Sequence, residues 1–140
     1  MQFDLKGHLN STNLAVSKAL WPLFEAVVNS IQSIEATEAY VIEKNPHVVA
    51  WAKNDHLGFE ILYTFDGVIH KYTPDFLIKL DNGKTLVLET KGQMTRKDVE
   101  KRKAMSAWVN VVNSISEFGT WCNDVSFNVA DVDGIIKNYL

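Results

Sequence analysis

The sequence feature that most constrains the fold is a β-hairpin predicted between His70 and Gly92, HKYTPDFLIKLDNGKTLVLETKG. Two apolar runs rich in β-forming residues flank the tripeptide Asp81-Asn82-Gly83. A three-residue hairpin loop commonly closes with a Gly in the left-handed region, and Gly83 stands at that position. The pattern therefore predicts two adjacent antiparallel strands joined by a tight loop.

The register of this hairpin decides which side chains share a face of the sheet. A three-residue loop pairs Phe76 with Leu88 and sets Asp75 opposite Glu89, whereas a two-residue Asn-Gly loop sets Asp75 opposite Thr90. The first register is favoured because alternation along the strands then gathers the apolar side chains on one face. That face holds Phe76, Ile78, Leu80, Leu86 and Leu88, and the opposite face holds Asp75, Glu89 and Lys91.

Two carboxylates and an ammonium on one sheet face are typical of a site that binds a cation. Directly opposed carboxylates repel each other unless a cation lies between them. Mg²⁺ takes few protein carboxylates and keeps several waters. A metal held in this way lowers the pKa of a bound water and stabilises charge on a phosphoryl oxygen, and Lys91 can orient the water or neutralise the phosphate. The residues predict phosphodiester hydrolysis with Mg²⁺ as cofactor and Mn²⁺ as a substitute.

The same residues resemble the motif of the PD-(D/E)xK nuclease superfamily. Pro74-Asp75 matches its first half and Glu89-Thr90-Lys91 its second, with thirteen residues between them. The run VVAWAKNDHLGFEILYTFDGVIHKYTPDFLIKLDNGKTLVLETKGQ, continued by AMSAWVNVVNSISEFGTWCNDVSFNVADV, resembles the C-terminal endonuclease domain of type III restriction enzymes, the Res subunit. The resemblance covers about residues 39–140.

This resemblance implies an α/β fold with an αβββαβ core, in which helices flank a mixed central sheet. It implies Mg²⁺-dependent cleavage of double-stranded DNA, and the helicase and methyltransferase subunits of a restriction system as further partners. The matching catalytic positions are Asp75, Glu89 and Lys91, and the predicted metal site comprises Asp75, Glu89, Thr90 and Glu60. A catalytically silent DNA-binding or interaction module derived from such a nuclease is the alternative function.

Glu60 enters the predicted metal site through strand pairing. The run 59–65 alternates as a strand, and Asp66-Gly67 is a strong two-residue hairpin signal that pairs Phe65 with Val68. Continuing this register sets Glu60 opposite Thr73, on the face of Asp75. Glu38, on the helix that precedes the first strand, is the rival third acid, and a solvent-facing strand glutamate is the other interpretation of Glu60.

The predicted DNA-binding residues belong to a basic helix and a polar loop. The run 96–103 carries five basic residues against two acids in a chain of net charge −3, so any attraction to DNA has to be local. Arg96, Lys97, Lys101 and Arg102 form the predicted DNA-binding edge, with Lys53 and His56 as a second set; a solvated helix face is the alternative. This helix is expected to end near 113 or 114 and to bury Ala104, Ala107, Trp108, Val111 and Val112.

The first 38 residues are predicted to be a helical segment separate from the nuclease-like domain 39–140. Apolar residues recur with helical period from Leu14 to Ile34, and the helix is expected over about 23–35 with an extension towards Lys44. The run ALWPLFEAVVNSIQSIE resembles the first helix of GHKL ATPases, in which Glu25 and Asn29 would match the catalytic Glu and the Mg²⁺-binding Asn. The glycine-rich ATP-binding loops of that family do not follow, so an amphipathic packing helix is favoured over an ATPase remnant.

Composition sets the outer limits. A chain of 140 residues with 46% hydrophobic content forms one packed domain rather than a disordered tail. Its single cysteine, Cys122, excludes an internal disulfide. Because the sequence shows neither a membrane-length apolar run nor a signal peptide, a cytoplasmic location is expected. A last strand is predicted over 125–129, followed by a helix from Val132 to Leu140 capped by Asp131.

Overall fold

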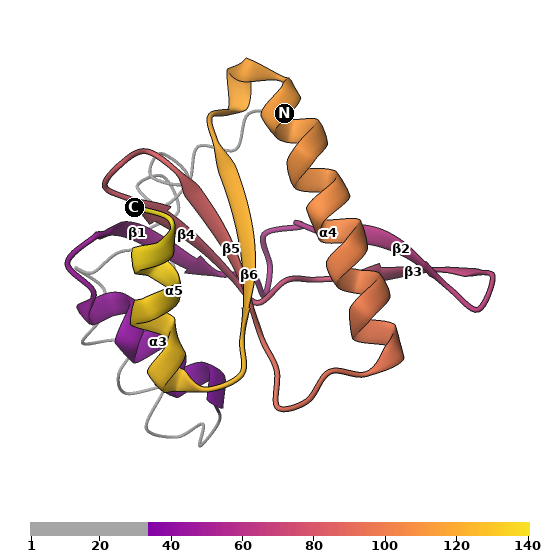
Figure 1. Cartoon of the computed structure of the whole chain (residues 1–140), viewed down its shortest axis with the longest axis horizontal. Helices are drawn as coiled ribbons and strands as arrows, with labels where there is room; N and C mark the ends of the chain where they lie inside the picture. The colour runs from indigo at the N-terminus through magenta and orange to yellow at the C-terminus, as the bar shows by residue number, and fades with distance from the viewer. Residues whose placement is uncertain (1–33) are drawn as a thin grey trace.

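A computed structural model describes residues 34–140 of the chain; the expectations for residues 1–33, including Glu25 and Asn29, lie outside this part. Figure 1 shows the described elements, which follow one another in this order: α3 (Ile34–Lys44), β1 (Val48–Lys53), β2 (Ile61–Phe65), β3 (Val68–Tyr72), β4 (Phe76–Leu80), β5 (Thr85–Thr90), α4 (Arg96–Ser114), the 3-10 turn η2 (Ser116–Phe118), β6 (Trp121–Ser126), the 3-10 turn η3 (Val129–Asp131) and α5 (Val132–Asn138).

Four strands form one mixed sheet in the order β1-β4-β5-β6. β4 is antiparallel to both β1 and β5, whereas β6 runs parallel to β5. Parallel neighbours need a crossover connection, and α4 supplies it between β5 and β6. The predicted α/β class, a mixed sheet flanked by helices, is confirmed.

The central hairpin has the predicted register. Phe76 pairs with Leu88, and Leu80 N–H donates to the Lys84 carbonyl at 2.9 Å. Gly83 closes the loop with φ +89° and donates its N–H to the Leu80 carbonyl at 3.0 Å. The three-residue loop is therefore the one that forms, and it carries Asp75 and Glu89 to the same end of the sheet.

Each face of the sheet is buried under a different layer. The apolar face predicted from the hairpin lies against α3 and α5, in a cluster that includes Phe76, Leu88, Ile42 and Ile136. The other face lies against α4 and the β2–β3 hairpin, where Val87 packs in a cluster with Met105, Val109, Tyr63 and Tyr72. Figure 1 shows α4 on the opposite side of the sheet from α3 and α5. Glu89 and Lys91 follow Val87 on the α4 side because side chains alternate along a strand.

The strand pairing on which the expectation for Glu60 depends is wrong in one respect. β2 and β3 pair with each other in the predicted register, Phe65 with Val68, but they form a separate two-stranded sheet. The neighbour of β4 is instead β1, where Trp51 pairs with Ile78 and Ala52 with Leu77. The reason is burial: β1 is almost wholly apolar and fills both cores, whereas the outer face of the β2–β3 hairpin stays exposed.

Two further boundaries differ from expectation. β6 begins at Trp121 and ends at Ser126, earlier than the predicted strand, because its parallel pairing with β5 starts with Thr85 opposite Trp121. In α4, which has the predicted ends, Ala107 and Val111 are exposed. The inner stripe runs through Met105, Trp108, Val109 and Val112, spaced three and four residues apart as one helix face requires.

The two shorter helices, α3 and α5, end as follows. α3 stops at Lys44, just before Asn45-Pro46, as predicted. α5 stops at Asn138, and Asp131 stands at its N-cap without a side-chain hydrogen bond, so the predicted cap is wrong. Within residues 34–140 no helix is both long and apolar enough to span a bilayer.

The loop that sets the register gives a first testable prediction. Gly83→Ala places a side chain at φ +89°, a backbone that L-residues adopt at a cost of about 1–2 kcal/mol, although the space around it is open. We expect this variant to lose about that much free energy of unfolding in urea. Gly134→Ala, in the open space of α5 at ordinary φ, should gain up to about 1 kcal/mol. Equal effects at both positions would contradict the role of Gly83 in the loop.

Candidate functional site

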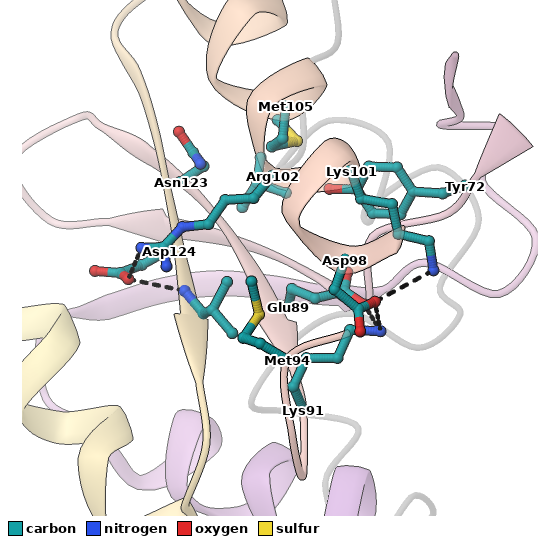
Figure 2. Close-up of a pocket in the computed structure, with 12 residues that line it drawn as sticks. Tyr72, Glu89, Lys91, Met94, Asp98, Lys101, Arg102, Met105, Asn123 and Asp124 are labelled. Carbon is teal, nitrogen blue, oxygen red and sulfur yellow. Dashed lines mark hydrogen bonds and ion pairs between the residues drawn. The ribbon is translucent and has the colours of Figure 1, made fainter. Parts of the chain in front are cut away.

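Two of the predicted catalytic residues, Glu89 and Lys91, lie where β5 ends under the N-terminal half of α4, whereas Asp75, just before β4, does not line the cavity there. Figure 2 shows Glu89 and Lys91 of this segment facing Asp98, Lys101 and Arg102 of α4. Together with β6 and Tyr72 they enclose a cavity of about 20 Å³, enough for about one water or one small cation. The full lining is Tyr72, Val87, Glu89, Lys91, Met94, Asp98, Lys101, Arg102, Met105, Asn123, Asp124 and Val125.

Glu89 is a buried carboxyl whose two oxygens have different surroundings. Its side chain is 14% exposed, and Oε1 lies 3.3 Å from Nζ of Lys91. Oε2 is buried and accepts no hydrogen bond from the described residues. Burial, and then the charge of Asp75, raises the pKa of Glu89 to about 7 against the opposing effect of Lys91. A buried carboxylate oxygen without a donor is costly, so a cation at Oε2 would be stabilising.

Asp75 is fixed beside this carboxyl by the strand opposite. Its Oδ2 accepts two hydrogen bonds from Thr90, one from the main-chain N–H at 2.8 Å and one from Oγ1 at 3.0 Å. Its own carbonyl accepts the N–H of Asn54 at 2.8 Å, which ties the segment to the end of β1. The hairpin register thus brings Asp75, Glu89 and Thr90 together, as predicted.

Lys91 is held between two carboxylates. Its Nζ lies 3.3 Å from Oε1 of Glu89 and 3.0 Å from Oδ1 of Asp98. Burial alone would lower the pKa of Lys91, but its hydrogen bonds and charge interactions with Asp98 and Glu89 outweigh this and raise it. The side chain is 21% exposed and positively charged at neutral pH, so it can neutralise an anionic group at the cavity.

Asp98 is the residue of the site that the sequence interpretation missed. It is 8% exposed, and with Thr95 it forms a capping box at the start of α4. Burial would raise the pKa of Asp98, but hydrogen bonds from Thr95 and from Lys91 hold it well below its usual range. The sequence carries a signal for this residue, because Thr-x-x-Asp before a helix is a capping pattern. Its contact with Lys91 is tertiary and has no local signal.

The aromatic wall of the cavity comes from the β2–β3 hairpin. Nζ of Lys101 lies 5.6 Å from the centre of the Tyr72 ring and 5.9 Å from that of Tyr63. Burial, and then the charges of Glu89 and Asp75, raises the pKa of the Tyr72 phenol. Tyr72 therefore stays protonated at neutral pH.

The two rival third acids lie in different places. Glu60 is exposed on the outer hairpin and pairs with Lys71 at 3.5 Å, and it does not line the cavity. The argument that put it on the face of Asp75 fails because β3 does not pair with β4. Glu38 is fully buried on α3 and accepts a hydrogen bond at 3.1 Å from Oγ of Ser126, the β6 residue paired with Thr90. Glu38 therefore lies next to the motif strand, on the side of α3.

The predicted DNA-binding residues divide into an outward and an inward group. Arg96 and Lys97 are exposed at the start of α4, over the ring of Phe65 at 5.5 and 5.8 Å from its centre. Lys101 turns towards the cavity, 3.6 Å from Asp98, and Arg102 lies 3.7 Å from Asp124 of β6.

The second predicted set lies in the loop after β1. His56 is exposed there, and Nζ of Lys53 lies 3.9 Å from the carboxylate of Asp55. Neither residue lines the cavity.

The donor set can be tested against the predicted Mg²⁺. Within residues 34–140 no group of three His, Cys, Asp or Glu side chains is spaced to hold a metal ion. Mg²⁺ needs only one or two carboxylates, because it keeps most of its waters. Asp75 and the unmatched oxygen of Glu89 supply two carboxylates, hard oxygen donors of the kind that Mg²⁺ prefers. The residues therefore fit a two-carboxylate magnesium site.

Comparisons with protein-family models, with curated proteins and with solved structures all found no match. The geometry of the site and its motif are therefore what indicate a function.

The buried carboxyl gives a pH prediction. The folded chain holds the Glu89 proton more tightly than the unfolded chain, so this contribution to stability is full below about pH 4.5 and is lost as pH rises through about 7. The loss is at most about 3 kcal/mol. We expect Glu89→Gln to flatten the decline in the free energy of unfolding between pH 5 and 8 when no divalent cation is present.

Urea unfolding across this pH range measures the effect. Glu60→Gln, which makes the same charge change at an exposed position, is the matched control and should keep the wild-type slope. If the free energy of unfolding of Glu89→Gln changed with pH in parallel with that of the wild type, Glu89 would have the same pKa in the folded and unfolded chain, which would contradict the prediction.

Proposed function

We propose that this chain is a Mg²⁺-dependent nuclease domain of the PD-(D/E)xK type that hydrolyses phosphodiester bonds in double-stranded DNA. The observation that carries the proposal is the buried Oε2 of Glu89, which lacks a hydrogen-bond donor among the described residues and belongs to a carboxyl beside Asp75. The order α3–β1–β4–β5–α4–β6, read without the β2–β3 insertion, supports it because it has the αβββαβ form that the motif implies.

The roles of the residues follow from their positions. Mg²⁺ would be held by Asp75 and Glu89, and when bound it supplies an activated water and charge stabilisation at the phosphoryl group. Thr90 fixes the orientation of Asp75 through two hydrogen bonds. The Lys91 ammonium, 3.3 Å from Glu89, neutralises the phosphate as negative charge grows on it. Its pKa, raised by Asp98 and Glu89, keeps it charged for this role.

The proposed DNA contact lies at the start of α4. Arg96 and Lys97 are exposed on the side of α4 that faces the β2–β3 hairpin, next to the cavity-lining residues of the same helix. Cations at this position would bind the phosphates on either side of the scissile bond, and they provide local attraction in a chain of net charge −3. Within a restriction system, helicase and methyltransferase subunits would be the further partners.

One observation favours the alternative, a DNA-binding or interaction module that does not cleave. The cavity of about 20 Å³ is too small for a phosphate group, and three ion pairs join its acidic and basic residues: Lys91–Asp98, Lys101–Asp98 and Arg102–Asp124. Cleavage therefore requires α4 to move away from β5. A chain in which α4 stays closed would bind DNA on its exposed basic residues without hydrolysing it.

Metal binding is the first test of the proposal. We expect Asp75→Ala and Glu89→Ala each to abolish Mn²⁺ binding measured by isothermal titration calorimetry, because each removes one of two carboxylate ligands. Far-UV circular dichroism should show that the fold is kept. Glu60→Ala is the control of equal charge, and it should bind Mn²⁺ like the wild type because Glu60 is exposed on the outer hairpin and pairs with Lys71. Unchanged Mn²⁺ affinity in both the Asp75 and the Glu89 variant would show that these residues are not the metal ligands.

DNA binding gives a second, independent test. Neutralising Arg96 and Lys97 to Gln should lower the slope of log affinity against log salt by about one to two units for duplex DNA, with little change in sequence preference. Lys44→Gln/Lys137→Gln makes the same charge change at exposed positions beside α5 and should leave the slope as in the wild type. Fluorescence anisotropy at several salt concentrations measures it, and equal slopes in all three proteins would place the DNA elsewhere.

A further inference from the structure

Asp98 divides its two carboxylate oxygens between the helix start and the site. Oδ2 accepts hydrogen bonds from Thr95, at 3.0 Å from the main-chain N–H and 2.6 Å from Oγ1. Oδ1 faces two ammonium groups, Lys91 at 3.0 Å and Lys101 at 3.6 Å. The side chain is 8% exposed, and Thr95 fixes its rotamer from the side away from the lysines. Asp98 thus presents one oriented negative oxygen to Lys91 and has no free oxygen for a metal.

Oδ1 of Asp98 holds the ammonium group of Lys91. This ammonium lies between Asp98 and Glu89, and the contact with Asp98 is the shorter one, 3.0 Å against 3.3 Å. The contact with Glu89 places a positive charge on the carboxyl that the proposed metal site needs. Lys91 and a divalent cation therefore compete for Glu89, since two cations close to one carboxylate repel each other.

A movement of the Lys91 side chain alone can resolve this competition. Lys91 extends from the segment after β5 to Asp98 on the first turn of α4 (Figure 2). A small swing of the ammonium towards Asp98 keeps it in an ion pair and releases Oε1 of Glu89. Within residues 34–140, Glu89 and Asp98 are the carboxylates in contact with Lys91, so without Asp98 only Glu89 would remain.

We infer that Asp98 is a positioning residue: it draws the Lys91 ammonium onto α4, and so leaves Glu89 available to a divalent cation while keeping Lys91 beside the reacting phosphate. This inference rests on the proposed function, because it concerns the metal and the lysine of that site. It assigns a second role to a carboxylate whose local role is to cap α4. The start of the helix and the placement of the lysine then depend on one side chain.

A double-mutant cycle between Asp98 and Lys91 separates this role from capping and from a general electrostatic effect. Asp98→Asn keeps an acceptor for Thr95 and replaces the oxygen that faces Lys91 by an amide without charge. We expect it to weaken Mn²⁺ binding roughly tenfold in the wild-type background, because Lys91 then pairs with Glu89 alone. In the Lys91→Ala background the same substitution should change the Mn²⁺ affinity by less than about twofold, since the competing ammonium is gone.

Calorimetric titration of Mn²⁺ into the four proteins of the cycle gives the result, with thermal unfolding as a parallel readout. Val109→Ala, which removes buried methyl groups of α4 away from the cavity lining, controls for loss of helix stability: it should lower the melting temperature and leave Mn²⁺ affinity unchanged. An equal loss of affinity from Asp98→Asn in both backgrounds overturns the inference, as does a comparable loss in Val109→Ala.

Failure of the proposed function gives a different result. A wild-type chain that takes up no Mn²⁺ overturns the metal site itself and the role of Asp98 with it. Failure of the inference alone leaves Mn²⁺ bound to the wild type and the two Asp98→Asn effects equal.

Discussion

The burial of Glu89 is the interaction on which the rest of the site depends. β5 lies between β4 and β6 and is covered on both faces, so a carboxyl near its end is removed from water on the side of α4. Burial raises its pKa to about 7, and Asp75 adds to this effect. Such a position is unfavourable for an isolated carboxylate. Lys91 offsets this cost by pairing with Glu89, and Lys91 is itself paired with Asp98. An apolar side chain in place of Glu89 would give the folded chain equal or greater stability, so stability alone does not explain a carboxyl at this position.

The parts of this arrangement that could be predicted are those fixed by local pattern. Gly83 and the alternation of apolar residues set the hairpin register, and this register alone places Asp75, Glu89 and Thr90 together. The ends of α4 follow from its flanking residues in the same way. The α/β class followed from the order of these local elements, and the structure confirms it.

The parts that could not be predicted depend on contacts between segments distant in sequence. The strong Asp66-Gly67 turn predicted the β2–β3 hairpin correctly, but nothing local shows that β4 pairs with β1 instead of β3. That pairing removed Glu60 from the face of Asp75 and left Glu38, buried on α3 and bonded to Ser126 of β6, as the remaining candidate for the third acid. Asp98 was overlooked because its capping pattern indicates a helix start, whereas its contact with Lys91 exists only once α4 packs on β5.

The central proposal is that Asp75 and Glu89 together hold a divalent cation. The most direct test is a crystal structure of the chain soaked in Mn²⁺, with anomalous scattering used to locate the metal. We expect one strong anomalous peak bonded to Oε2 of Glu89 and to a carboxylate oxygen of Asp75, with the Lys91 ammonium moved towards Asp98. A map at saturating Mn²⁺ with no peak between these two carboxylates, or with its peak at another position, would contradict the claim.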